Sequence, residues 1–342
     1  MPRPASPRST LTLFAGLITV NLLAWAWALI AFRDYPMLLG TAVLAYSFGL
    51  RHAVDADHIA AIDNATRKLI QEGQATQSVG LYFSLGHSSV VILASLLIAA
   101  SAASLQGELE AFHGIGALIG TSVSAAFLLL VALINLVILR SVYRAFRRVR
   151  QGERVGEAEL QGLLAGSGPI ARLARPLFGL IRRSWHLYPL GFLFGLGFDT
   201  ATEIGLLGIA ASQAAQNLPM VSILVFPALF TAGMALVDSA DSVLMTGAYR
   251  WAQVRPARKL YYNLTITSAS VLVALLVGGL EALNLLAGQL GLEGGAWDFI
   301  AEVNEQFGLL GYLIVGLFVA TWLLSWAFYR YKGYDRLNLS PA

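Results

Sequence analysis

Long apolar runs alternate with short polar segments along almost the whole chain. A helix that crosses a bilayer needs about 20 mainly apolar residues, and eight stretches reach that length. The pattern predicts an all-α, polytopic integral membrane protein with eight transmembrane helices. The predicted spans are residues 11–32, 37–63, 79–103, 114–140, 188–212, 219–247, 263–289 and 307–328.

The connections between these spans are short, with one exception. Residues 141–187, between the fourth and fifth spans, form a longer loop that is rich in arginine. Because the remaining connections leave no room for a second folding unit, we interpret residues 1–342 as a single transmembrane domain.

Composition agrees with a membrane protein. Hydrophobic residues make up 57% of the chain and charged residues only 13%, whereas a soluble domain is about one quarter charged. The first apolar run, residues 11–32, is longer than the core of a signal peptide and is kept as a helix. No cysteine is present, which excludes disulfides and thiolate metal sites.

The basic residues define an orientation. Loops on the cytoplasmic side of a membrane carry an excess of lysine and arginine. With the N-terminus inside, 21 of the 23 basic residues fall on inner segments, which leaves Arg33 outside and Arg51 within a span. We therefore predict a multi-pass protein of the plasma (inner) membrane with cytoplasmic N- and C-termini. The basic 141–187 loop indicates contact with anionic membrane lipid rather than with nucleic acid.

The second predicted span contains the segment "RHAVDADHI", residues 51–59. On a continuous helix His52, Asp55 and His58 follow one another at i, i+3 and i+6 and share a face. Two imidazoles and a carboxylate suit a borderline divalent transition-metal ion. Asp57 points elsewhere on such a helix and could orient a ligand histidine.

Three further spans carry polar side chains, and together they present many acids and few bases. A charge at the centre of a membrane helix costs roughly 2.5–3.5 kcal/mol on insertion scales. With Asp55 and Asp57 of the second span, the embedded carboxylates number six, against a single arginine, Arg51. A positive partner for these acids is missing, which indicates a cation pathway. The third span supplies His87, the fifth Asp199, Thr202 and Glu203, and the sixth Asp238 and Asp241.

A weak internal repeat relates spans two and three to spans five and six. The segment "FGLRHAVDADHI" aligns with "FGLGFDTATEI" with one gap, and "FSLGHS" aligns with "FTAGMA". In the predicted topology the two halves cross the membrane in opposite directions. Inverted repeats with a site near the midplane are a recurring plan of secondary transporters.

At these residues the sequence resembles the NiCoT family of nickel/cobalt transporters. "RHAVDADHI" matches the family's hallmark in the second span, and "FSLGHSSVV", "LGFDTATEIG" and "GMALVDSADS" match three further motifs. In the last motif Ser239 stands where the family usually has threonine, so a hydroxyl is kept. The resemblance implies a secondary transporter, a plasma-membrane permease for Ni²⁺, Co²⁺ or both.

The resemblance also implies a set of site residues. The transported ion would be bound in the second and third spans, and further polar residues would relay metal or protons. No G-x-x-x-x-G-K-[ST] motif is present, so we expect no ATPase subunit, and the metal is a substrate rather than a cofactor. The expected metal ligands are His52, Asp55, Asp57, His58 and His87, and the expected pathway residues are Arg51, Asp199, Thr202, Glu203, Asp238 and Asp241.

Other functions remain open at this stage. Some members of this family export metal and often have a histidine-rich cytoplasmic loop, whereas the 141–187 loop holds only His186, which favours uptake. A metal-binding accessory or sensor protein is a further alternative. An enzyme is not expected, because H-E-x-x-H is absent and the candidate histidines are too few for a di-iron site. The sequence leaves the choice between Ni²⁺ and Co²⁺ and the oligomeric state open.

Overall fold

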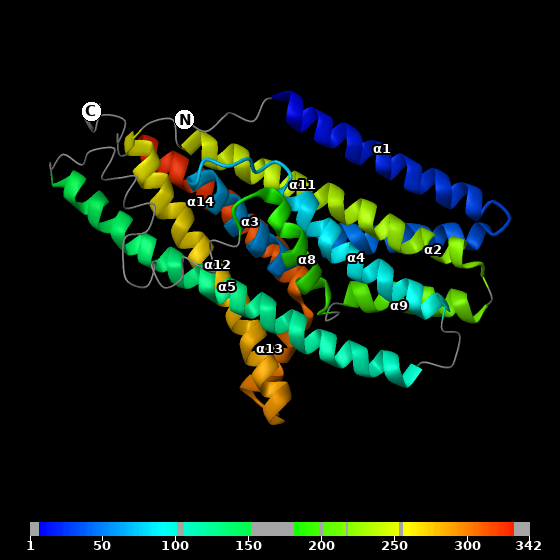
Figure 1. The fold of residues 1–342 in the computed structure, drawn as a ribbon. Coiled ribbons are helices and arrows are strands. Elements are labelled where there is room, and N and C mark those ends of the chain that lie inside the picture. The colour runs from blue at the N-terminus through cyan, green and yellow to red at the C-terminus, as the bar shows by residue number, and fades with distance from the viewer. Residues whose placement is uncertain are drawn as a thin grey trace.

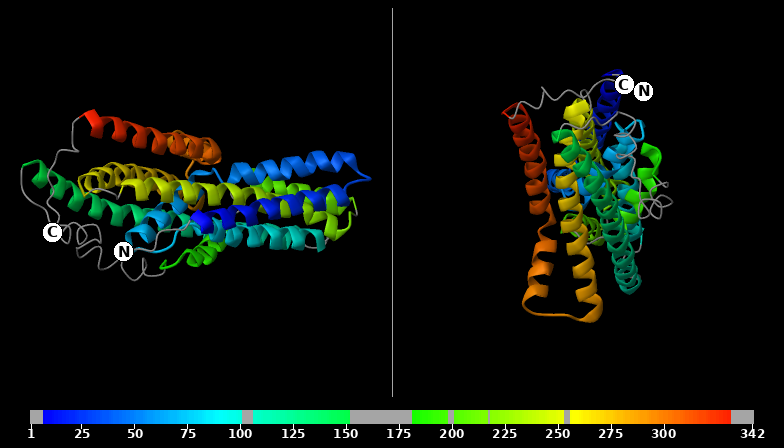
Figure 2. Two further views of the ribbon diagram at one scale, coloured as in Figure 1. Left: turned by 90° about the horizontal axis from the view of Figure 1, so that it is seen from above. Right: turned by 90° about the vertical axis from the view of Figure 1, so that its left-hand side faces the viewer.

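The structure is a computed structural model that describes residues 7–100, 106–151, 181–197, 201–216, 218–252 and 256–331. In these ranges all regular secondary structure is helical, and the long helices run side by side in a bundle (Figure 1). The turn between α12 and α13 projects from this bundle (Figure 2). The predicted all-α membrane architecture is confirmed.

Six helices of the described ranges are long and apolar enough to cross a membrane, and a bent pair brings the number to seven. The count of eight is therefore not confirmed. The six are α1 (Pro7–Ala31), α4 (Val79–Ala100), α5 (Gln106–Arg150), α11 (Val225–Ala252), α12 (Pro256–Leu290) and α14 (Phe307–Tyr331). Three shorter elements, η1 (Ser184–His186), α10 (Met220–Ile223) and α13 (Ala296–Glu305), lie in connections.

The second predicted span is not one continuous helix. It consists of α2 (Pro36–His52) and α3 (Ala56–Gln71), which are bent by 50° relative to each other. Asp55 is the N-cap of α3 with extended backbone angles, φ −63° and ψ 149°. Because this conformation interrupts the helix, the expectation that His52, Asp55 and His58 share one helical face is wrong.

The fifth predicted span is interrupted in the same way. Its two parts are α8 (Leu187–Gly195) and α9 (Ala201–Ala215), with Leu196 and Gly197 outside helical structure. In the alignment of the two halves Ala56, the first residue of α3, corresponds to Ala201, the first residue of α9. Both broken helices therefore restart at the same repeat position.

Close glycine contacts also correspond between the halves. A Cβ atom at Gly86 of α4 would lie 2.8 Å from the backbone nitrogen of Phe192 in α8, and one at Gly233 of α11 would lie 3.0 Å from the carbonyl oxygen of Tyr46 in α2. Gly86 aligns with Gly233, and Phe192 aligns with Tyr46. Because α2 and α8 run in opposite directions (Figure 1), these matching contacts support an inverted repeat.

The helix ends gather on two sides. In Figures 1 and 2 the C-terminal ends of α5 and α14 lie on the same side as the start of α12, whereas the connection between α1 and α2 lies on the opposite side. The outer faces of the bundle are apolar: Leu22 of α1 is 66% exposed and Leu324 of α14 is 69% exposed. Large exposed apolar side chains on long helices are typical of surfaces that contact lipid.

Candidate metal centre

Three imidazoles meet inside the bundle. His52 is the last residue of α2, His58 lies in the first turn of α3, and His87 is in the middle of α4. All three side chains are buried, and one nitrogen of each lies within 4.8 Å of the corresponding nitrogens of the other two. The break between α2 and α3 makes this possible, because it turns His58 back toward His52.

A carboxylate from the second half of the repeat completes a tight group of ligand atoms. Glu203, in the first turn of α9, places its Oε1 atom 2.7 Å from His87 Nε2 and 3.9 Å from His52 Nε2. The two Nε2 atoms are 2.9 Å apart. A point equidistant from these three atoms lies about 2.0 Å from each, which is an ordinary distance from a transition metal to nitrogen or oxygen ligands.

The chemical nature of these atoms is also informative. Two imidazole nitrogens and a carboxylate oxygen suit a borderline divalent transition-metal ion.

His52 is held in place from its other nitrogen. Asp55 Oδ2 lies 2.8 Å from His52 Nδ1, and the hydroxyl oxygen of Thr202 lies 3.2 Å from the same atom. A proton on Nδ1 that is donated to Asp55 leaves the Nε2 lone pair available for an ion. Carboxylates commonly orient ligand histidines in this manner. The geometry thus gives Asp55 an orienting position, where the sequence suggested a ligand.

The other expected site residues are distributed around this group. His58 Nδ1 lies 3.5 Å from Asp238 Oδ2 of α11, and Asp241 follows one turn later. Asp57 is half-buried in the first turn of α3, whereas Arg51 is exposed beside Gly308 of α14. Asp199 lies outside the described residues.

Asp63 is a buried carboxylate that the sequence reasoning did not include in the site. Asp63 of α3 accepts a hydrogen bond from the Tyr249 hydroxyl of α11 and another from the Ser270 hydroxyl of α12, both at 2.7 Å. It thereby joins three helices. Its position within an apolar span was visible in the sequence, but its two donors are about 190 and 210 residues away in the chain.

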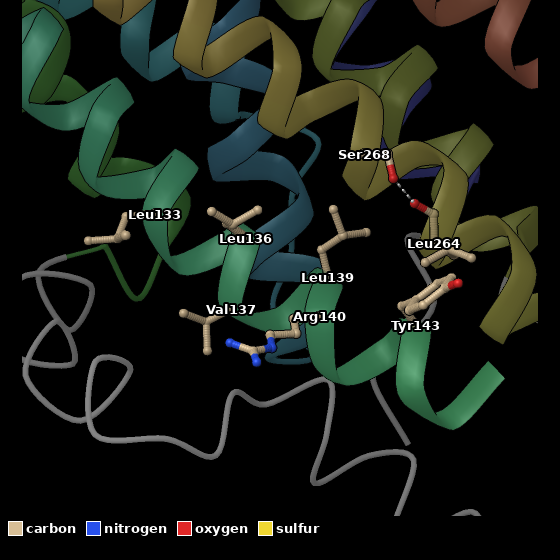
Figure 3. Close-up of a pocket in the computed structure, with 8 residues that line it drawn as sticks. All are labelled: Leu133, Leu136, Val137, Leu139, Arg140, Tyr143, Leu264 and Ser268. Atoms are coloured by element: carbon tan, nitrogen blue, oxygen red, sulfur yellow. Dashed lines mark hydrogen bonds between the residues drawn. The ribbon is translucent and has the colours of Figure 1, made fainter. Parts of the chain in front are cut away.

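A pocket elsewhere has a different character (Figure 3). It is a groove of about 720 Å³ between α5 and α12. The Ser268 hydroxyl, one of its few polar groups, donates to the Leu264 carbonyl of its own helix. A groove of this composition on spanning helices fits an acyl chain rather than a metal ion. Its lining consists of Leu133, Leu136, Val137, Leu139, Arg140, Tyr143, Leu264 and Ser268.

Comparison with known proteins identifies the family. A family model described as "High-affinity nickel-transport protein" matches residues 38–328, most of the chain. The chain belongs to this family, NicO. The predicted resemblance to nickel/cobalt transporters is confirmed, as is the expectation of a transport protein rather than an enzyme.

Individual relatives of the NicO family align over nearly their whole length. The chain is 58% identical over 330 residues to the high-affinity nickel transport protein of Cupriavidus necator, which covers 96% of this chain and 94% of that protein. It is 47% identical to the nickel transporter NixA of Staphylococcus aureus, over 94% and 95% of the two chains. The cobalt transport protein NhlF of Rhodococcus rhodochrous is 42% identical over 83% of this chain and 81% of its own. No solved structure matches significantly.

Proposed function

We propose that this NicO protein is a secondary transporter, a permease that takes up Ni²⁺, Co²⁺ or both through the site that His52, His87 and Glu203 form between the two repeats. The observation that carries the proposal is the meeting of three buried ligand atoms, His52 Nε2, His87 Nε2 and Glu203 Oε1, at separations of 2.7 to 3.9 Å. Relatives named as nickel and cobalt transporters support the choice of ions.

The ligand atoms bear on selectivity. The affinity order Co²⁺ < Ni²⁺ < Cu²⁺ means that affinity alone would favour copper, so selection depends on geometry and on which metals are available. Two imidazoles with one carboxylate suit a borderline ion such as Ni²⁺ or Co²⁺. The ion is cargo, and the proposal includes no resident cofactor.

The two helix breaks explain how such a site forms in the middle of a membrane. Broken helices place backbone and side-chain ligands at the interface of inverted repeats, around which the halves rock during alternating access. Thr202 and Glu203 in α9 come from one repeat, and His52 and His58 come from the other. Residues further along the path, which include Asp57, Asp199, Asp238 and Asp241, relay the ion or its displaced protons.

We place the protein in the plasma membrane with both termini in the cytoplasm. The excess of basic residues on the inner segments supports this orientation, and the basic 141–187 loop, most of which lies outside the described residues, would face anionic lipid. The membrane potential then drives uptake, since a divalent cation gains about twice 2.3 kcal/mol per 100 mV on moving inward. No ATPase subunit is part of the proposal.

Uptake of radioactive Ni²⁺ and Co²⁺ into cells tests this function. Cells with the wild-type protein should accumulate one or both metals, and His87→Ala should abolish accumulation at equal membrane levels, because it removes the ligand shared by both short contacts. His186→Ala is the matched control, since this half-buried histidine lies at the end of η1 and its ring contacts Trp185.

Three results would contradict the proposal in different ways. A lower metal content in cells with the wild-type protein would reverse the direction to export. Accumulation that survives His87→Ala would place the ion elsewhere. An unchanged content of both metals would leave a sensor or accessory protein as the better interpretation.

A further inference from the structure

A second group of buried ligand atoms lies next to the His52–His87–Glu203 site. It consists of His58 of α3 and Asp238 of α11, with the half-buried Asp241 one turn further along α11. The side chains of His58 and Asp238 are completely buried. The His58 ring centroid is 4.5 Å from that of His52 and 4.8 Å from that of His87, so the two groups are immediate neighbours.

The polar atoms of this second group lack hydrogen bonds. Within the described ranges, neither His58 nitrogen nor either Asp238 oxygen has a hydrogen-bond partner, and Asp241 Oδ2 has none. Leaving buried polar atoms without partners is costly. Asp63, by contrast, is a buried carboxylate in which each oxygen accepts a hydroxyl hydrogen bond. A positive ligand would satisfy the second group.

The spacing of the two closest atoms fits an ion between them. His58 Nδ1 and Asp238 Oδ2 are 3.5 Å apart, which exceeds the usual 2.7–3.2 Å of an N–H···O hydrogen bond. Two ligand atoms at about 2.1 Å from one ion have this separation when the angle between them is about 113°. The pair supplies one imidazole, whereas the first site supplies two, so it suits Ni²⁺ less well.

We propose that His58, Asp238 and Asp241 form a second cation station, which receives a divalent transition-metal ion from the His52–His87–Glu203 site on its way to the cytoplasm. The proposal rests on the proposed function. The ion moves only a short distance between the two sites, because the His58 ring adjoins the rings of His52 and His87. Weaker binding at the second station favours release of the ion to the cytoplasm. The Asp238 backbone lies against Gly80, seven residues before His87, so the station is nearer the start of α4. In Figure 1 α4 begins toward the side where α5 ends, which carries the basic segments.

The second station is tested by equilibrium binding of ⁶³Ni²⁺ to the purified full-length protein in detergent. Uptake is measured in parallel in cells. We expect two ions per wild-type chain, one bound tightly and one weakly. Asp238→Asn should keep the tight ion, lose the weak one and lower uptake at least about tenfold, a change typical for a lost ligand. Glu281→Gln, which neutralises a buried carboxylate on α12, should change neither stoichiometry nor uptake.

The outcomes separate the two proposals. A wild type that takes up Ni²⁺ but binds a single ion would overturn the second station and leave the permease intact. Loss of the tight ion in Asp238→Asn would also overturn it, because Asp238 would then belong to the first site. No binding together with no uptake would overturn both. If Asp238→Asn fails to reach the membrane, Asp241→Asn serves for the same measurements, with the same expected and contradicting results.

Discussion

At the residue scale, the environment gives chemically identical side chains different tasks. Asp55 is paired with a histidine nitrogen, Asp63 accepts two hydroxyl hydrogen bonds, and Asp238 has no hydrogen-bond partner within the described ranges. The first arrangement orients a ligand, the second joins helices, and the third leaves oxygens available to a cation. Residue type alone did not separate these roles, because each depends on partners that come from other helices.

Asp55→Asn should weaken Ni²⁺ binding by about 10–100-fold without changing the number of tightly bound ions, because an amide orients His52 less firmly and makes its Nε2 less basic. Isothermal titration of the purified variant measures both quantities. Asp34→Asn is the control, since that carboxylate is exposed and pairs with Arg33. Complete loss of the tight ion would instead make Asp55 a direct ligand.

Sequence reasoning found most of the residues at the site for a partly incorrect reason. Spacing on a continuous helix grouped His52, Asp55 and His58, and the three do lie together, but across a break between α2 and α3. Glu203 was expected in the pathway, and its carboxylate contacts His87. That contact joins residues 116 positions apart, which no local pattern encodes.

At the element scale, close helix packing depends on glycine. In membranes, helices associate through small residues that allow backbones to approach, because lipid offers no hydrophobic advantage for larger ones. Gly86 of α4 and Gly233 of α11 occupy corresponding positions and contact α8 and α2 respectively. The Gly86 contact holds α4, which carries His87, against α8, and the Gly233 contact holds α11 against α2.

Gly86→Ala should destabilise the protein by about 1–3 kcal/mol or more, as overpacking commonly does. The added Cβ would lie 1.9 Å from the carbonyl oxygen of Tyr188, a backbone atom that cannot move independently. Thermal unfolding in detergent and the level in membranes report the loss. Gly208→Ala in α9 is the control, because a Cβ there meets nothing within 4 Å. Equal stability of the two variants would contradict the close packing of α4 on α8.

At the scale of the whole molecule, orientation and symmetry are linked. An inverted repeat requires its two halves to cross the membrane in opposite directions, and α2 and α8 do so relative to the bundle (Figure 1). Which side of the bundle faces the cytoplasm follows from the basic segments. The connection after α3, with Arg67 and Lys68 nearby, and the connection between α1 and α2 should therefore lie on opposite sides of the membrane.

Cysteine labelling tests this orientation directly, because the chain contains no cysteine. Asp34→Cys, between α1 and α2, should react with a membrane-impermeant maleimide in intact cells. Gln74→Cys, in the exposed turn after α3, should react only after permeabilisation. The opposite pattern would reverse the orientation, and reaction of both in intact cells would contradict the assignment of α2 and α3 to one membrane crossing.

The sequence by itself determined the membrane-spanning class, the approximate helix positions, the family motifs and the chemical nature of the site. Hydrophobic length, charge distribution and local motifs carry this information, because each depends on neighbouring residues alone. The tertiary structure decided where the second and fifth spans break, which carboxylate meets His87, and which histidines lie together. These features depend on contacts between distant helices, and packing in three dimensions rather than local pattern sets them.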